Sequence, residues 1–126
     1  IHFNSEGERL RVEWIADNGL YASSYEVILW ESSSNDIVMR EAGNNINEED
    51  DEYYLPLPND KNDKRLLDIR TKITAYDENT NYRISINVYQ GMKTIFTNET
   101  VSEKPLAEAE TATLQKYFTL SNSNDL

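Results

Sequence analysis

Hydrophobic and polar residues alternate along most of the chain, as they do in strands that bury one face. In residues 9–14, RLRVEW, the side chains of Leu10, Val12 and Trp14 share one face and charged side chains share the other. The same period of two predicts further strands at residues 24–31, 36–41, 65–73, 81–89 and 92–102. The segment 36–41 is short and is expected at the edge of a sheet.

Two segments break this alternation. Residues 43–64 are polar, contain five consecutive acids from Glu48 to Glu52, and are expected to form a long loop. In residues 105–118, PLAEAETATLQKYF, Pro105 suits the first turn of a helix, and several apolar side chains roughly share one helical face. We therefore expect residues 106–126 to be a linker or tail with a short helix.

Strands separated by turn signals, without alternating helices, predict an all-β fold. We expect an antiparallel β-sandwich of about seven strands over residues 1–105. With 126 residues the chain is long enough for one domain with its own core. Its 38% hydrophobic and 28% charged residues are typical of a globular protein rather than a disordered one.

Three segments resemble the fibronectin type III family. LRVEW is similar to the family's second strand, with Trp14 in the place of its core tryptophan. GLYASSYEVIL, with Leu20 and Tyr25, resembles the start of the family's strand C. YDENTNYRISINVY carries Thr80 and Tyr82 where the family has its Thr-x-Tyr element, although Tyr76 and Glu78 replace the family's leucine and proline.

The resemblance implies an immunoglobulin-like sandwich and structural roles for these residues. Tyr82 is expected to form a tyrosine corner, in which its ring packs under the crossing between sheets and its hydroxyl bonds an upstream backbone group. Thr80 suits the extended approach to that strand. Trp14 and Tyr25 are expected in the core.

A binding face is expected from strand parity and from the resemblance together. If Tyr25 points inward, Ile28 and Trp30 point outward. The family's strands C and F are neighbours, which implies that Arg83 and Tyr89 lie on the same outer face. Because Trp, Tyr and Arg dominate binding hot spots, we interpret Ile28, Trp30, Arg83 and Tyr89 as a partner-binding surface. Two local alternatives stay open: Trp30 stacks on Arg83, or the loop 43–64 covers it.

Charge and composition limit the classes of partner and of catalytic or metal site that the sequence supports. A net charge of −11 disfavours nucleic acid and anionic membranes as partners, and no apolar run is long enough to span a bilayer. There is no cysteine and a single histidine, His2, so Ser-His, Cys-His and histidine–metal sites lack parts. We expect no enzyme activity, cofactor or metal. Three interpretations of the acidic run 48–52 stay open. It offers oxygen ligands for Ca²⁺, although without EF-hand spacing, or it contacts a basic partner, or it is a solvated loop.

These features predict a non-catalytic protein-interaction or spacer module, and the resemblance implies an extracellular adhesion or receptor protein with neighbouring domains in tandem. The protein is expected to be secreted or membrane-anchored, and the sequon NET makes Asn98 a candidate for glycosylation. The alternatives are a carbohydrate-binding accessory module of a bacterial surface enzyme, with Trp30 and Tyr89 stacking on sugar rings, and a purely structural spacer.

Overall fold

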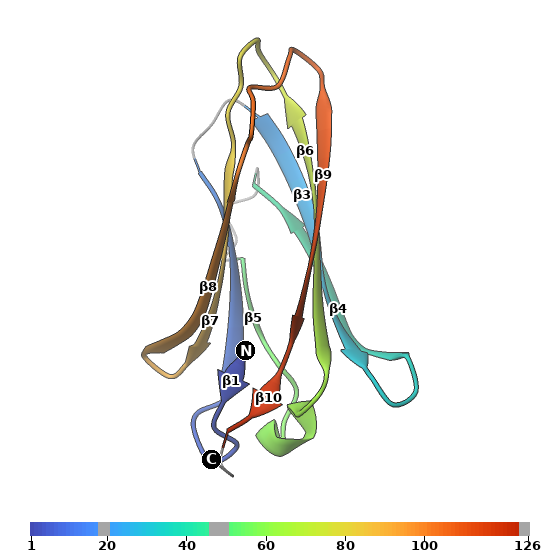
Figure 1. Ribbon diagram of the computed structural model, residues 1–126, viewed down its shortest axis with the longest axis vertical. Helices are drawn as coiled ribbons and strands as arrows, with labels where there is room; N and C mark the ends of the chain where they lie inside the picture. The colour runs from blue at the N-terminus through green and yellow to red at the C-terminus, as the bar shows by residue number, and fades with distance from the viewer. Residues whose placement is uncertain (18–20, 46–50, 124–126) are drawn as a thin grey trace.

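The computed structural model describes residues 1–17, 21–45 and 51–123, and it is a sandwich of two antiparallel sheets (Figure 1). The first sheet has the order β5-β2-β7-β8, formed by Glu52–Tyr54, Leu10–Ala16, Arg83–Gln90 and Lys93–Val101. The second has the order β4-β3-β6-β9, formed by Asp36–Asn44, Tyr21–Glu31, Leu66–Ala75 and Thr111–Thr119. The predicted all-β sandwich is confirmed.

A small parallel pair closes one end of the sandwich. Strands β1 (His2–Phe3) and β10 (Ser121–Asn122) lie side by side at the lower end in Figure 1, beside the 3₁₀ helix η1 (Asn59–Asn62). Phe3 and Leu120 are fully buried there, so both ends of the chain contribute to the core. Within the described ranges, no helix has the length and apolar character that crossing a bilayer requires.

The core forms where the inward faces of the two sheets meet. Trp14 on β2 stacks on Tyr25 on β3, with ring centroids 4.2 Å apart. The Trp14 indole N–H donates a hydrogen bond to Thr71 Oγ1 on β6 at 3.1 Å. Both aromatic residues are almost fully buried, which confirms their predicted core positions. The alternation on β2, β3 and β6 is likewise confirmed by buried Leu10, Val12, Val27, Leu29, Leu67, Ile69 and Ile73.

The predicted helix in residues 106–126 is wrong. Thr111–Thr119 is strand β9, which pairs antiparallel with β6 along its whole length and forms the edge of the second sheet. The sandwich therefore extends past residue 105 and includes the predicted tail. A few apolar residues at helical spacing do not decide the conformation of this segment. Without β9, the edge of β6 would leave backbone N–H and C=O groups unpaired, and pairing with β9 satisfies them.

The long loop predicted at 43–64 is only partly a loop. It contains β5, which hydrogen-bonds to the edge of β2, and η1, whose Asn59 and Asn62 side chains bond backbone carbonyls. Leu55 is fully buried between these elements. This segment covers one end of the core, and its residues 46–50 lie outside the described part.

The chain crosses from β6 to β7 through residues 76–82, where the tyrosine corner was expected. Thr80 is buried, its hydroxyl donates to the Asp77 carbonyl at 2.7 Å, and its backbone bridges to Leu106. Tyr82 packs half-buried against the core, but its hydroxyl bonds no described residue. Thr80 thus lies at a buried, hydrogen-bonded position, and within the described residues the Tyr82 hydroxyl does not form the hydrogen bond expected of it. Paired backbone hydrogen bonds between Thr80 and Leu106 tie down the crossing.

Candidate ligand-binding face

The four residues predicted to form one binding surface lie on two different sheets. Ile28 and Trp30 are on β3 in the second sheet, whereas Arg83 and Tyr89 are on β7 in the first. The neighbours of β3 are β4 and β6, and β7 pairs with β2 and β8. The expectation that strands C and F adjoin is therefore wrong, and so is the shared face built on it.

Arg83 and Tyr89 have local partners on the first sheet. The Tyr89 hydroxyl donates to a Glu13 carboxylate oxygen at 2.8 Å, and the Arg11 guanidinium lies over the Tyr89 ring, 4.5 Å from its centroid. The hydrogen bond to Glu13 raises the pKa of Tyr89. Arg83 forms an exposed ion pair with Glu99 at 3.4 Å. Trp30 does not stack on Arg83, because the two belong to opposite layers.

Ile28 and Trp30 do point outward on the second sheet, as predicted from parity. Ile28 is nevertheless 1% exposed, and it lies outside the main core cluster. Its cross-strand partners on this face are Arg40 on β4 and Asp68 on β6. Ile28 is thus a buried apolar residue beneath polar side chains and is not exposed to a partner. Its predicted role as a partner-binding residue is wrong.

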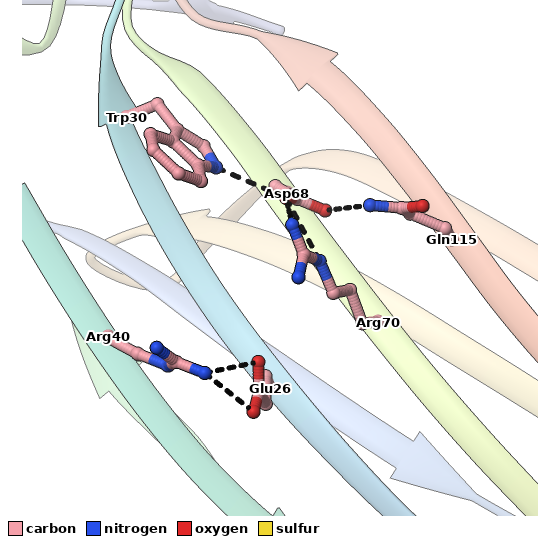
Figure 2. Close-up of polar contacts among 6 residues, drawn as sticks. All are labelled: Glu26, Trp30, Arg40, Asp68, Arg70 and Gln115. Atoms are coloured by element: carbon pink, nitrogen blue, oxygen red, sulfur yellow. Dashed lines mark hydrogen bonds and ion pairs between the residues drawn. The ribbon is translucent and has the colours of Figure 1, made fainter. Parts of the chain in front are cut away.

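A buried carboxylate organises this outer face. Asp68 is 1% exposed, and Figure 2 shows three side chains converging on it. The Trp30 indole N–H donates to Asp68 Oδ2 at 3.1 Å, and Arg70 donates to the same oxygen through Nε at 3.2 Å and Nη2 at 3.0 Å. Gln115 Nε2 donates to Oδ1 at 3.3 Å. Strands β3, β6 and β9 each contribute a donor, so both carboxylate oxygens are satisfied.

The network fixes the side chains around it. A buried charge is tolerated only when it is paired and hydrogen-bonded, so Trp30 and Arg70 are held where Asp68 needs them. Hydrogen bonds to Asp68 raise the pKa of Arg70. On the neighbouring strands, Arg40 Nη2 contacts both Glu26 carboxylate oxygens at 3.0 and 3.2 Å (Figure 2).

The residues next to Asp68 enclose a surface depression of about 380 Å³. Trp30 lines one side and Tyr117, on β9 directly opposite Asp68, lines the other. Leu66, Asp68 and Arg70 on β6 form the part between them, and Ser32 and Asn35 from the β3–β4 turn complete the rim. Tyr117 is 55% exposed, whereas Trp30 is half-buried. We call the outward residues Glu26, Trp30, Leu66, Asp68, Arg70, Gln115 and Tyr117 the Asp68 face.

Most of the Asp68 face was not predicted. Asp68, Arg70 and Lys72 recur at a period of two inside an otherwise apolar strand, and this pattern was a usable signal for an outward polar row. Tyr117 was missed because its segment was interpreted as a helix. Trp30 is the one predicted contact residue that the structure brings into this site, and β6, β9 and their side chains supply its neighbours.

Asn98, the candidate glycosylation site, is on β8 directly opposite the core residue Ile86. Directly opposed residues share a face, so the Asn98 side chain points toward the other sheet. Its Oδ1 is buried and has no hydrogen-bond partner in the part of the chain that the structure describes. This orientation is unfavourable for a glycan acceptor, and glycosylation of Asn98 stays an untested prediction.

The acidic run is only partly described. Glu48, Glu49 and Asp50 lie outside the described residues, so their interpretation as a Ca²⁺ or basic-partner contact is not addressed. Asp51 accepts a hydrogen bond from the Tyr25 hydroxyl at 2.5 Å, and Glu52 pairs with Arg11 at 2.8 Å. Among the residues that the structure describes, no three His, Cys, Asp or Glu side chains are grouped to hold a metal ion.

A comparison of the chain with protein-family models, with curated proteins and with solved structures finds no match.

Proposed function

We propose that this protein is a non-catalytic glycan-binding module whose ligand lies on the Asp68 face. The observation that carries the proposal is the pair Trp30 and Tyr117, which flank one depression whose floor holds Asp68 and Arg70. This keeps the carbohydrate-binding alternative raised by the sequence and the role of Trp30 within it. In this proposal Tyr117 takes the sugar-stacking role that the sequence suggested for Tyr89, because Tyr89 belongs to the other sheet.

Aromatic side chains and polar groups in one shallow site suit a sugar. The negative face of an aromatic ring attracts the weakly positive C–H groups on the flat side of a pyranose. The hydroxyl groups around the ring rim need hydrogen-bond donors and acceptors, which Arg70, Ser32 and Asn35 supply. Binding sites commonly combine such apolar walls with a few placed polar groups.

Preorganisation supports the proposal further. Trp30 and Arg70 are already fixed by Asp68 in the free protein, so ligand binding orders few side chains. Fixing a rotamer-rich side chain on binding costs about 0.5–1.5 kcal/mol, and this cost is largely avoided here. A purely structural spacer gains nothing from holding an aromatic ring half-exposed in this way.

A protein partner on the same face is the second candidate, and it keeps the interaction-module function expected from the sequence. Ile37, on β4 opposite Trp30, is 46% exposed and extends the apolar surface beside the depression. Trp, Tyr and Arg are the residue types enriched in protein hot spots. Location at the cell surface, and membership of an adhesion protein or receptor, remain expectations under either candidate.

A glycan array with matched variants tests the proposed function. Tyr117→Ala removes one aromatic wall, and Tyr54→Ala is the control because Tyr54 is 58% exposed, against 55% for Tyr117, on the outer face of the other sheet. We expect the wild type and Tyr54→Ala to bind the same glycans, and Tyr117→Ala to bind about tenfold more weakly or worse. Binding that is lost with Tyr54→Ala and kept with Tyr117→Ala contradicts the face assignment.

The array also separates the two candidates. If the folded wild-type domain binds no glycan on the array, the glycan proposal fails and the protein-partner candidate takes its place. Circular dichroism of each variant shows that a lost signal reflects the binding face rather than unfolding.

A further inference from the structure

We propose that the ligand of the Asp68 face is an extended, neutral, linear glycan chain that lies along β3 and β6, rather than a single terminal sugar. This inference rests on the proposed function and adds to it the length, the direction and the charge of the ligand.

The first observation is a second depression on the same face. It has a volume of about 450 Å³, and among its lining residues are Ser24, Glu26, Lys72 and Thr113. Arg70 lines both this depression and the one beside Trp30 and Tyr117. Arg70 is therefore the boundary that the two depressions share, and we interpret them together as one groove across the outer face.

The strand register gives the groove its direction. Trp30 pairs with Leu66 at one end, and Ser24 pairs with Lys72 at the other, with Asp68 and Arg70 between them on β6. Lys72 lies six positions after Leu66, which corresponds to about 20 Å along the strand. This length exceeds a single sugar ring, so a ligand that fills the groove has several linked rings.

The groove changes in character along its length. Trp30 and Tyr117 form an aromatic end, whereas Ser24, Lys72 and Thr113 are exposed hydrogen-bonding side chains at the far end. At the middle, Arg70 uses Nε and Nη2 for Asp68, and its Nη1 has no partner among the described residues. One ring stacks at the aromatic end, and the following rings meet hydroxyl, ammonium and guanidinium groups.

The charges on this face favour a neutral chain. Arg70 pairs with Asp68 and Arg40 with Glu26, each at 3.0 Å, so these charges cancel locally. Lys72 adds one positive charge, whereas the whole chain carries −11. A polyanionic glycan is repelled on approach by the net charge, and the one positive charge of Lys72 offsets little of that repulsion. Neutral hydroxyl-rich chains meet no such barrier.

The test measures affinity against chain length. Ladders of cello-, manno- and xylo-oligosaccharides, each from the monosaccharide to chains longer than the groove, are titrated by calorimetry into the wild type. We expect the Kd of the bound ladder to fall by about tenfold or more from the disaccharide to the groove-filling length, and then to level off. Polygalacturonate, a polyanion, is expected to bind more weakly than the neutral chain.

Two variants assign the ends of the groove. The double variant Lys72→Ala, Thr113→Ala is expected to weaken the longest chain by about tenfold and leave the disaccharide unchanged. Tyr117→Ala is expected to weaken both. Lys93→Ala, an exposed lysine on the other sheet, is the control for Lys72 and is expected to change neither.

The outcomes separate the inference from the proposed function. Equal affinity for short and long chains, with both lost in Tyr117→Ala, overturns the extended-chain inference and leaves glycan binding standing. Tighter binding of polygalacturonate overturns the assignment of a neutral ligand. No binding to any ladder, together with an empty glycan array, overturns both the inference and the proposed function.

Discussion

Asp68 shows how one residue connects stability to the proposed site. A carboxylate on the outer face of a sheet is normally solvated, yet Asp68 is 1% exposed and accepts hydrogen bonds from three side chains. It lies beside buried Ile28, so side chains on this face pack as a second, smaller layer outside the main core. The same bonds that satisfy the carboxylate hold Trp30 and Arg70 at the depression.

Replacing Asp68 by Asn is therefore expected to affect both properties. Asp68→Asn keeps the shape but removes the charge, so the donors of Trp30 and Arg70 lose a charged acceptor. We expect the free energy of unfolding to fall by about 1–3 kcal/mol in urea titrations. Acrylamide quenching of tryptophan fluorescence is expected to rise, because Trp30 is released while Trp14 stays in the core.

A paired variant makes that experiment specific. Adding Trp30→Phe to Asp68→Asn is expected to abolish the increase in quenching, since the released tryptophan is then absent. An increase that persists in the double variant means that Trp14 has become accessible and that Asp68 supports the whole core rather than the face.

At the scale of elements, strand period and strand pairing were predictable to different degrees. Leu10, Val12 and Trp14 alternate with charged residues, and their burial follows from that pattern alone. Pairing depends on long-range contacts that local sequence does not encode, so the neighbours of β3 and β7 were assigned wrongly. In β9 the inward positions are Ala112, Leu114, Lys116 and Phe118. Lys116 interrupts the apolar alternation, so the pattern of this segment does not predict a strand.

Removing β9 tests the corrected element boundaries. A chain that ends at Pro105 lacks β9, β10 and the buried residues Leu106 and Leu120. It leaves the β6 edge unpaired and Phe96 without its ring contact to Phe118. We expect this truncated chain to be unfolded or to melt far below the full chain by circular dichroism. Equal melting temperatures would restore residues 1–105 as the complete domain.

At the scale of the molecule, the two outer faces of the sandwich differ in how they use aromatic residues. On the first sheet, Arg11 lies over Tyr89 and Arg9 lies over Tyr54, so each ring makes a cation–π contact with an arginine. On the second sheet, Trp30 and Tyr117 flank a depression instead. The sandwich itself was predictable from alternation, but the candidate site was not, because it depends on which strands lie side by side.

The most direct test of the Asp68 face uses the two tryptophan side chains as internal reporters. An isotope-labelled domain is titrated with the best-binding glycan while the two indole N–H resonances are followed by NMR. The Trp30 indole donates to Asp68 at the proposed site, whereas the Trp14 indole donates to Thr71 in the core. We expect the Trp30 resonance to shift with ligand, together with the amides of β6 and β9, and the Trp14 resonance to stay. Shifts confined to β2, β7 and β8 would contradict it and place the binding face on the opposite sheet.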